Sequence, residues 1–209
     1  MGQYYIPTII SVDGEINTLY SHDFGSGSKL TEHSWVGNYL VNAIYSKIHK
    51  QPATIAWIGD YSDEGKKEYE KSDELYTQTI DYRDFKKYYK IAWGKSEKYF
   101  LPKSNFSDKD FDVFTDDTKG MFLVNHTIKR YLDLEKYIEQ CSIKDKDGDA
   151  WCLNPLSLLT ACGNGRGGGD FHHGHTGYKD VGAWAFHLLE YTDEIPGGYM
   201  EAEFSFIED

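Results

Sequence analysis

The residues best suited to chemistry gather in a glycine-rich stretch that spans residues 163–177. Glycine lacks a Cβ atom and tolerates positive φ, so consecutive backbone N–H groups can point into one concavity and hold an anion. A guanidinium within such a loop adds a bidentate donor for phosphate or carboxylate. The residues expected to bind a small anionic ligand are Gly163, Asn164, Gly165, Arg166, Gly167, Gly168 and Gly169. The alternative is a tightly turned surface loop that binds nothing.

Three histidines, His172, His173 and His175, follow these glycines together with Asp170. Imidazoles and carboxylates are metal ligands, and the spacing of His173 and His175 allows chelation from a strand or turn. The sequence identifies neither a fourth ligand nor the outer residues that orient metal ligands. We expect no cofactor. A divalent metal at the histidines stays a hypothesis beside exposed, unliganded side chains.

Cys162 directly precedes the glycine loop and supports a catalytic hypothesis. A thiol can act as a nucleophile with His173 as base and Asp170 to orient it, while loop amides stabilise an oxyanion. The alternative is a small buried residue at the end of an apolar helix. Cys141, Cys152 and Cys162 are separated by ten and nine residues, which fits neither a zinc pair nor a disulfide framework. We expect reduced thiols in a cytoplasmic protein.

Three further polar residues lie elsewhere in the chain. His33 and Ser34 fall in the first turn of a predicted helix, where such a pair usually caps the helix. Asp60 follows a predicted buried strand, a common position for a functional carboxylate. Convergence of Asp60, His33 and His126 on one pocket would favour an enzyme.

The distribution of charge limits the classes of partner. The 209-residue chain has 34 acidic and 22 basic residues and a net charge of −12, so we expect no general binding to nucleic acid or to an anionic membrane. The last twenty residues contain seven acidic and no basic side chains. They form either a solvated face and tail or a docking surface for a basic protein, with Glu201 and Glu203 as partner-binding residues. Neither a membrane span nor a signal peptide is expected.

The elements that must position these residues predict an α+β fold. Two or three helices pack on a mostly antiparallel sheet of hairpins, within a single domain of residues 1–209. One hairpin is expected at the Asp13-Gly14 turn and another between residues 121–125 and 130–134.

Helical spacing of apolar residues predicts a helix over residues 31–50 with Thr31 as its N-cap. A second helix is expected over residues 82–93, because its aromatic side chains share one face. A short apolar helix begins at Pro155 and ends near Cys162.

Strands are expected at four further places. Pro7 lies in the first β-rich run, which predicts an edge strand or a bulge. Residues 54–58 form a buried apolar run, and residues 181–191 resemble another strand. Residues 200–206 alternate apolar and polar side chains, which predicts a half-buried strand with an acidic outer face.

Several segments together carry a resemblance to a known group of proteins. They are the opening Met1-Gly2-Gln3-Tyr4-Tyr5, residues 123–127, the block from Asn154 to Asp170, and Val181-Gly182-Ala183-Trp184. The chain resembles a group of uncharacterised proteins from bacterial and phage genomes. The resemblance covers most of the chain and implies a small intracellular protein carried on mobile elements. It implies no catalytic residue.

Two functions fit these observations. The first is an acidic binding protein, such as an inhibitor or interaction protein of a phage or mobile element. It would act through the acidic C-terminal strand or the glycine-rich loop. The second is a small hydrolase or nucleotide-processing enzyme centred on Arg166, Asp170 and the histidines at 172–175. Because no complete catalytic constellation is visible, we favour the binding protein.

Overall fold

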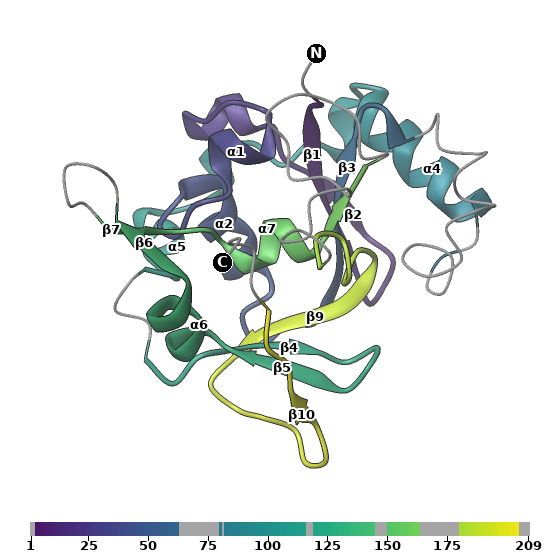
Figure 1. Ribbon diagram of the computed structural model, residues 1–209. Coiled ribbons are helices and arrows are strands. Elements are labelled where there is room, and N and C mark those ends of the chain that lie inside the picture. Colours follow the sequence, from purple (N-terminus) through teal and green to yellow (C-terminus); the bar gives the residue numbers. More distant parts are fainter. Residues whose placement is uncertain are drawn as a thin grey trace.

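The fold is seen in a computed structural model that describes residues 3–62, 80, 82–115, 119–144, 150–163 and 180–204. The strands of the main sheet are β1 (Tyr5–Ser11), β2 (Ile16–Thr18), β3 (Ala53–Gly59), β4 (Phe122–Asn125), β5 (Arg130–Asp133), β8 (Ala161–Cys162), β9 (His187–Thr192) and β10 (Met200–Glu201). Their order is β10-β5-β4-β9-β3-β1-β2, and β8 pairs with β3 (Figure 1). A separate antiparallel pair joins β6 (Ser142–Lys144) to β7 (Ala150–Cys152).

Helices connect and cover these strands. Within the described ranges, the helices of seven or more residues are α2 (Tyr39–Lys47), α4 (Tyr82–Trp93) and α6 (Leu134–Cys141). The shorter helices are α1 (Leu30–His33), α5 (Asp108–Phe111) and α7 (Pro155–Leu159), with 3-10 turns η1 (Ser21–Phe24), η3 (Glu97–Tyr99) and η4 (Lys103–Asn105). The predicted α+β class with a mostly antiparallel sheet is confirmed.

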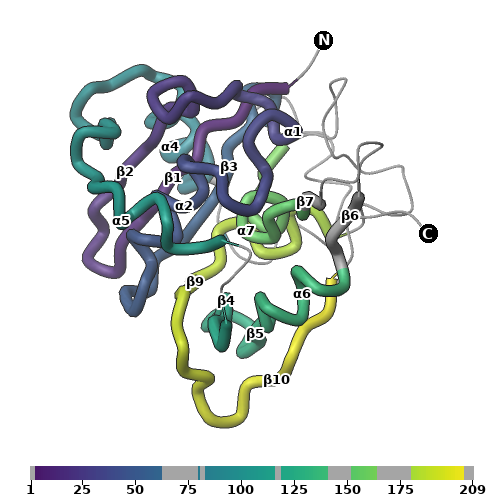
Figure 2. Tube along the Cα trace, turned by 90° about the vertical axis from the view of Figure 1, so that its left-hand side faces the viewer, coloured from purple at the N-terminus to yellow at the C-terminus, as the bar shows by residue number. Residues whose placement is uncertain are grey.

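Side-chain alternation gives β1 and β3 two buried faces. Tyr5 and Trp57 belong to the apolar cluster that includes the buried residues of α2 and α7. Ile6 and Ile58 belong to a second cluster, which includes Phe85 of α4. Figure 1 shows α2 and α4 on opposite sides of these strands. The two ends of the main sheet are well separated, since β4, β5 and β10 lie away from β1 and β2 in Figure 2.

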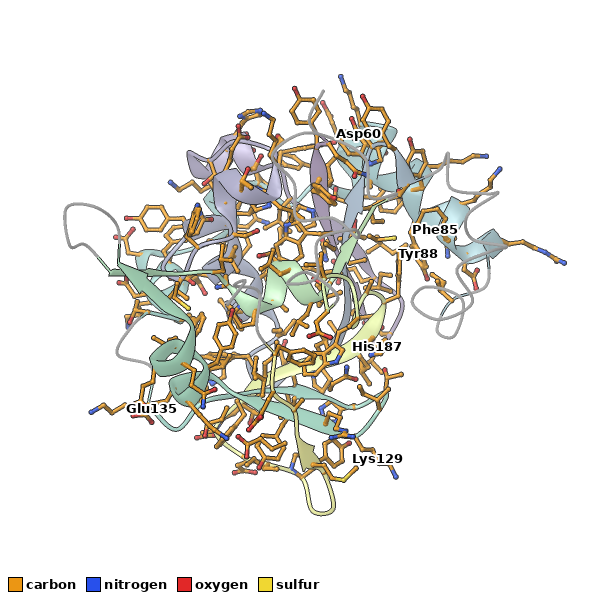
Figure 3. The ribbon with its side chains drawn as sticks, in the orientation of Figure 1. Asp60, Phe85, Tyr88, Lys129, Glu135 and His187 are labelled. Carbon is orange, nitrogen blue, oxygen red and sulfur yellow. The ribbon has the colours of Figure 1, made fainter. Side chains whose placement is uncertain are left out.

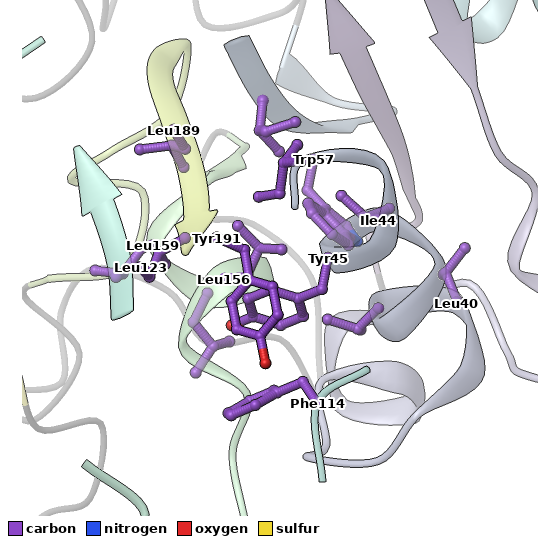
Figure 4. Packing of buried hydrophobic residues seen from close by; sticks show 14 of the residues in the cluster. Leu40, Ile44, Tyr45, Trp57, Phe114, Leu123, Leu156, Leu159, Leu189 and Tyr191 are labelled. Carbon is purple, nitrogen blue, oxygen red and sulfur yellow. The ribbon is translucent and has the colours of Figure 1, made fainter. Parts of the chain in front are cut away.

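Three aromatic rings pack at the centre of the larger cluster (Figure 4). The Tyr45 ring lies 4.7 Å from Phe114 and 4.9 Å from Tyr191 between centroids. Both phenol groups have acceptors, because Tyr45 Oη donates to Asn154 Oδ1 at 3.2 Å and Tyr191 Oη donates to the Val113 carbonyl at 2.8 Å. These bonds satisfy polar groups that would be costly to bury unpaired.

The single helix predicted over residues 31–50 is wrong, because the chain breaks between α1 and α2. Val36 N donates to the Cys152 carbonyl and Asn154 N donates to the Ser34 carbonyl, so residues 34–36 run extended beside residues 152–154. Gly37 then adopts a φ of +82°. Asn38, and not Thr31, provides a side-chain N-cap for the long helix, since its Oδ1 accepts from Leu40 N and Val41 N.

Pro7 occupies a strand that has neighbours on both sides, rather than the predicted edge or bulge. It lies opposite Trp57, whose N–H donates to Thr160 on the other side of β3. In an antiparallel pair, two directly opposed residues either both point their N–H and C=O groups toward the partner strand or both point them away from it. The Trp57 N–H points away from β1, so the backbone groups of Pro7 point away from β3. The missing N–H of Pro7 therefore faces away from β3, beyond the last paired residue of β2, and costs the β1–β3 pairing nothing.

Two predicted elements have different ends in the structure, because pairing with neighbouring strands sets where each begins or stops. Helix α7 ends at Leu159 rather than Cys162, because residues 160–162 run alongside β3. The strand predicted over residues 181–191 begins only at His187, after a turn in which Phe186 adopts a φ of +61°.

The acidic strand predicted over residues 200–206 is shorter than expected. β10 ends at Glu201, and Met200 is 58% exposed rather than half-buried. Among the described strands, β10 is the first in the sheet order and pairs with β5. Phe204 lies beyond the strand, where its ring packs edge-on against Trp184 at 5.1 Å.

Replacement of Asn38 tests the observed start of α2. We expect Asn38→Ala to lower the free energy of unfolding by about 1 kcal/mol, because two backbone N–H groups lose their acceptor. Urea denaturation measures this change. The control is Asn105→Ala, at an exposed residue of η4, which we expect to be neutral. Equal effects of the two variants would contradict the cap.

Candidate ligand-binding cleft

Most of the predicted anion loop, and the Asp170 and histidines that follow it, lie outside the part of the chain that the structure describes. The residues concerned are Asn164, Gly165, Arg166, Gly167, Gly168, Gly169, Asp170, His172, His173 and His175. Within the described ranges, no group of three or more His, Cys, Asp or Glu side chains could hold a metal ion. The metal hypothesis for the histidines therefore stays a prediction.

Gly163, the first residue of that loop, has a packing role. A Cβ atom at this position would lie 2.7 Å from Tyr5 Oη and 2.8 Å from Gln3 Oε1, which is too close for a real side chain. Tyr5 Oη itself donates to Gln3 Oε1 at 3.1 Å. Close approach to these two side chains thus accounts for glycine at 163 without an anion.

Cys162 is fully buried in β8. It belongs to the apolar cluster that contains Ile58 and Phe85. A substrate cannot reach a thiol in this position unless the chain rearranges. The geometry agrees with the buried alternative, although the residue lies in a strand and not at the end of a helix.

His33 is also buried, between two fixed hydrogen-bond partners. Its Nδ1 lies 2.9 Å from the Gly27 carbonyl and its Nε2 lies 3.0 Å from Trp57 Nε1. A carbonyl only accepts and an indole only donates, so the imidazole is neutral with its proton on Nδ1. Burial lowers the pKa of His33 to about 4, against the raising effects of the Gly27 bond and of Glu32.

Asp60, His33 and His126 do not converge on one site. Asp60 Oδ1 accepts from Tyr4 N at 3.1 Å, while His126 bonds to Glu190 and Tyr199. Asp60 and the turn that carries His126, marked by Lys129, lie at opposite ends of the molecule in Figure 3.

The two proposed partner-binding carboxylates already have an internal partner. Lys136 Nζ lies 2.7 Å from Glu201 Oε1 and 3.2 Å from Glu203 Oε1. The hydrogen bonds that Lys136 donates to Glu201 and Glu203, together with the negative charges of these carboxylates, raise the pKa of Lys136. The acidic face near β10 is therefore partly neutralised.

A cleft that the sequence patterns did not indicate lies between the start of β1, the segment 20–32 and the end of α4. Its volume is about 510 Å³. It is lined by Tyr4, Ile6, Tyr20, His22, Gly27, Ser28, Lys29, Glu32, Trp93 and Lys95. Tyr20 and Lys95 also line a smaller hollow of about 170 Å³ beside it, with Ser96, Glu97 and Phe100.

One wall of the cleft is fixed by backbone hydrogen bonds to β1. Tyr5 N donates to the Ser28 carbonyl at 2.8 Å, which holds the segment 27–29 beside the strand. Glu32 Oε2 accepts from Lys29 N at 3.0 Å and completes a capping box at the start of α1. Alternation along β1 directs Tyr4 and Ile6 to the cleft while Tyr5 enters the core.

The opposite wall is the end of α4. Gly94 N donates to the Lys90 carbonyl at 2.9 Å, and Lys95 then adopts a φ of +52°, so the helix stops beside the cleft. Trp93 Nε1 is buried and has no acceptor among the described residues. Because this nitrogen is buried, Trp93 contributes the surface of its ring to the cleft rather than a hydrogen-bond donor.

The cleft carries more positive than negative side chains. Lys29 and Lys95 line it, with the imidazole of His22 beside them, against the single carboxylate of Glu32. The Lys29–Glu32 contact is long, at 3.9 Å. Burial, followed by the charge of Asp23, raises the pKa of the Tyr20 phenol, which therefore stays neutral.

Comparison of the chain with models of protein families, with curated proteins and with solved structures finds no match. No helix in the described ranges is long and apolar enough to cross a membrane. The chemistry of the cleft is therefore inferred from its own side chains.

The burial of His33 predicts a pH-dependent stability. Because its folded pKa of about 4 lies below the ordinary histidine value of 6.5, the unfolded chain binds more protons between these values, and stability falls as the pH falls. We expect a loss of roughly 3 kcal/mol from His33 between pH 6.5 and 4. His187, whose pKa burial also lowers to about 4, acts in the same direction.

Urea denaturation at several pH values measures this dependence, and proton NMR of the imidazoles identifies the groups responsible. A His33 resonance that titrates near pH 6.5 in the folded protein would contradict the assigned environment.

Proposed function

We propose that this protein binds a small anionic ligand that carries a planar ring, in the cleft between β1 and the end of α4. The observation that carries the proposal is the lining of this cleft, in which three aromatic rings and three basic side chains meet in a chain of net charge −12. The proposed function belongs to the class expected from the sequence, a binding protein for a small anion. It places the ligand in this cleft rather than in the glycine-rich loop.

The aromatic residues supply surfaces for a planar ring. Tyr4, Tyr20 and Trp93 come from three separate segments and line one space. Tyr20 has a ring contact with Phe100 at 4.9 Å, and Tyr4 is 47% exposed. Stacking of a nucleobase on such a ring contributes about 1–3 kcal/mol.

The basic side chains supply charge. Lys95 has no ion-pair partner among the described residues, and Lys29 makes only the long contact with Glu32. Local positive charge in a concave site attracts an anion even when the whole protein repels polyanions. The volume falls within the range of about 300–1,000 Å³ that is usual for small-molecule sites. A nucleoside monophosphate combines the required ring, charge and size.

The other two predicted modes receive less support from the described residues. A basic protein at Glu201 and Glu203 would have to displace Lys136 from both carboxylates. A hydrolase centred on Arg166 and Asp170 depends on residues outside the described ranges, and Cys162 is inaccessible.

Calorimetric titration with adenosine monophosphate tests the proposal. We expect saturable binding that Lys95→Glu weakens by about tenfold or more, equivalent to about 1.4 kcal/mol. The matched control is Lys129→Glu, because Lys129 has a similar φ of +55° but lies on the turn between β4 and β5.

A second pair of variants separates stacking from charge. Tyr4→Ala should weaken binding, whereas Tyr39→Ala, at a tyrosine of similar exposure outside the cleft, should not. The proposal fails if neither nucleoside monophosphates nor aromatic carboxylates bind. It also fails if the control variants weaken binding as much as the cleft variants.

A further inference from the structure

Three polar side chains form a continuous hydrogen-bonded relay at the end of the molecule remote from the cleft. His126 Nε2 lies 2.8 Å from Glu190 Oε2, and His126 Nδ1 lies 3.0 Å from Tyr199 Oη. They come from the β4–β5 turn, from β9 and from the segment before β10. Register brings them together, since Val124 opposes Glu190. The carboxylate and imidazole are mostly buried, with 16% and 19% of their side chains exposed.

The partners determine the roles of the two imidazole nitrogens. An ionised Glu190 only accepts hydrogen bonds, so Nε2 of the neutral His126 ring carries the proton. Nδ1 then has a free lone pair, which accepts from the Tyr199 hydroxyl. In this order, His126 Nδ1 can accept the proton of the Tyr199 hydroxyl, and the Glu190 carboxylate bonds to the other ring nitrogen.

Exposed apolar side chains lie in the same two segments as His126 and Tyr199. Ile128 lies two residues after His126 and is 45% exposed, Met200 follows Tyr199 and is 58% exposed, and Ile195 of the same connecting segment is 40% exposed. Exposed apolar side chains of this size can bind the apolar part of a substrate. In these segments they would hold it near the relay.

We propose that Tyr199 is a nucleophile, activated by His126 and Glu190, for carboxylic esters and related electrophiles that carry an apolar group. Tyr199 Oη attacks the carbonyl carbon while His126 Nδ1 takes the phenolic proton and Glu190 stabilises the imidazolium. The bond between the carbonyl carbon and the leaving oxygen then breaks, and His126 returns the proton to that oxygen. The products are an O-acyl tyrosine and an alcohol.

Phenylmethylsulfonyl fluoride is a probe for this chemistry, because it forms a stable sulfonate ester. Tyr199 Oη bonds to sulfur, the sulfur–fluorine bond breaks, and fluoride leaves while His126 takes the proton and passes it to solvent. Peptide mapping by mass spectrometry gives the rate at each tyrosine. We expect Tyr199 to react at least about tenfold faster than Tyr39, which is half exposed but belongs to no such relay.

Variants distinguish activation from mere exposure. His126→Gln should reduce the rate at Tyr199 to that at Tyr39, Glu190→Gln should reduce it several-fold, and Lys129→Ala in the same turn should leave it unchanged. The proposal is overturned if Tyr199 of the unchanged protein reacts no faster than Tyr39. A rate at Tyr199 that survives His126→Gln in a folded variant overturns it equally, because the relay would then only fasten the segment.

Discussion

The cleft depends on one buried imidazole. His33 donates to the Gly27 carbonyl and accepts from Trp57 Nε1, so a single side chain ties the central strand β3 to the segment beside β1. Both bonds are buried and both require the same neutral tautomer. With Tyr5 N bonded to the Ser28 carbonyl, the segment 27–29 is held from two directions. The wall that carries Ser28 and Lys29 is therefore fixed to the folded core.

Close backbone approach is a second constraint at the same end of the sheet. Gly59 is the last residue of β3 and Gly163 directly follows the parallel strand β8, and a Cβ atom on either glycine would collide with Gln3. Asp60 then accepts from Tyr4 N. These contacts place the start of β1, and with it Tyr4, at the edge of the cleft. Asp60, which its location after a strand marked as a candidate functional carboxylate, thus has a positioning role here.

Local signals in the sequence were sufficient for the hairpins and for α4. The Asp13-Gly14 turn and the aromatic periodicity of residues 82–93 each operate within a few residues. The break before α2 could not be predicted, because it depends on pairing of residues 34–36 with residues 152–154, more than a hundred positions away. Tyr4 and Tyr5 show the same limit, since adjacent identical residues enter the cleft and the core respectively.

The residues of both candidate sites are far apart in the sequence, so they form no recognisable motif. Tyr20, Trp93 and Lys95 belong to no common motif, and each aromatic residue alone is typical of a core. The same is true of His126, Glu190 and Tyr199, which only sheet register brings together. Glycine, histidine and charged residues are dense instead in the stretch 163–177, which is why the sequence pointed there.

Binding of an anionic planar ligand in the cleft can be followed through the indole N–H resonances of the five tryptophans. In an isotope-labelled sample titrated with adenosine monophosphate, we expect the Trp93 resonance to move saturably. The Trp57 resonance, whose N–H is bonded to His33, should stay in place. A titration in which Trp93 is unaffected, with or without changes at the other tryptophans, would contradict binding in the cleft.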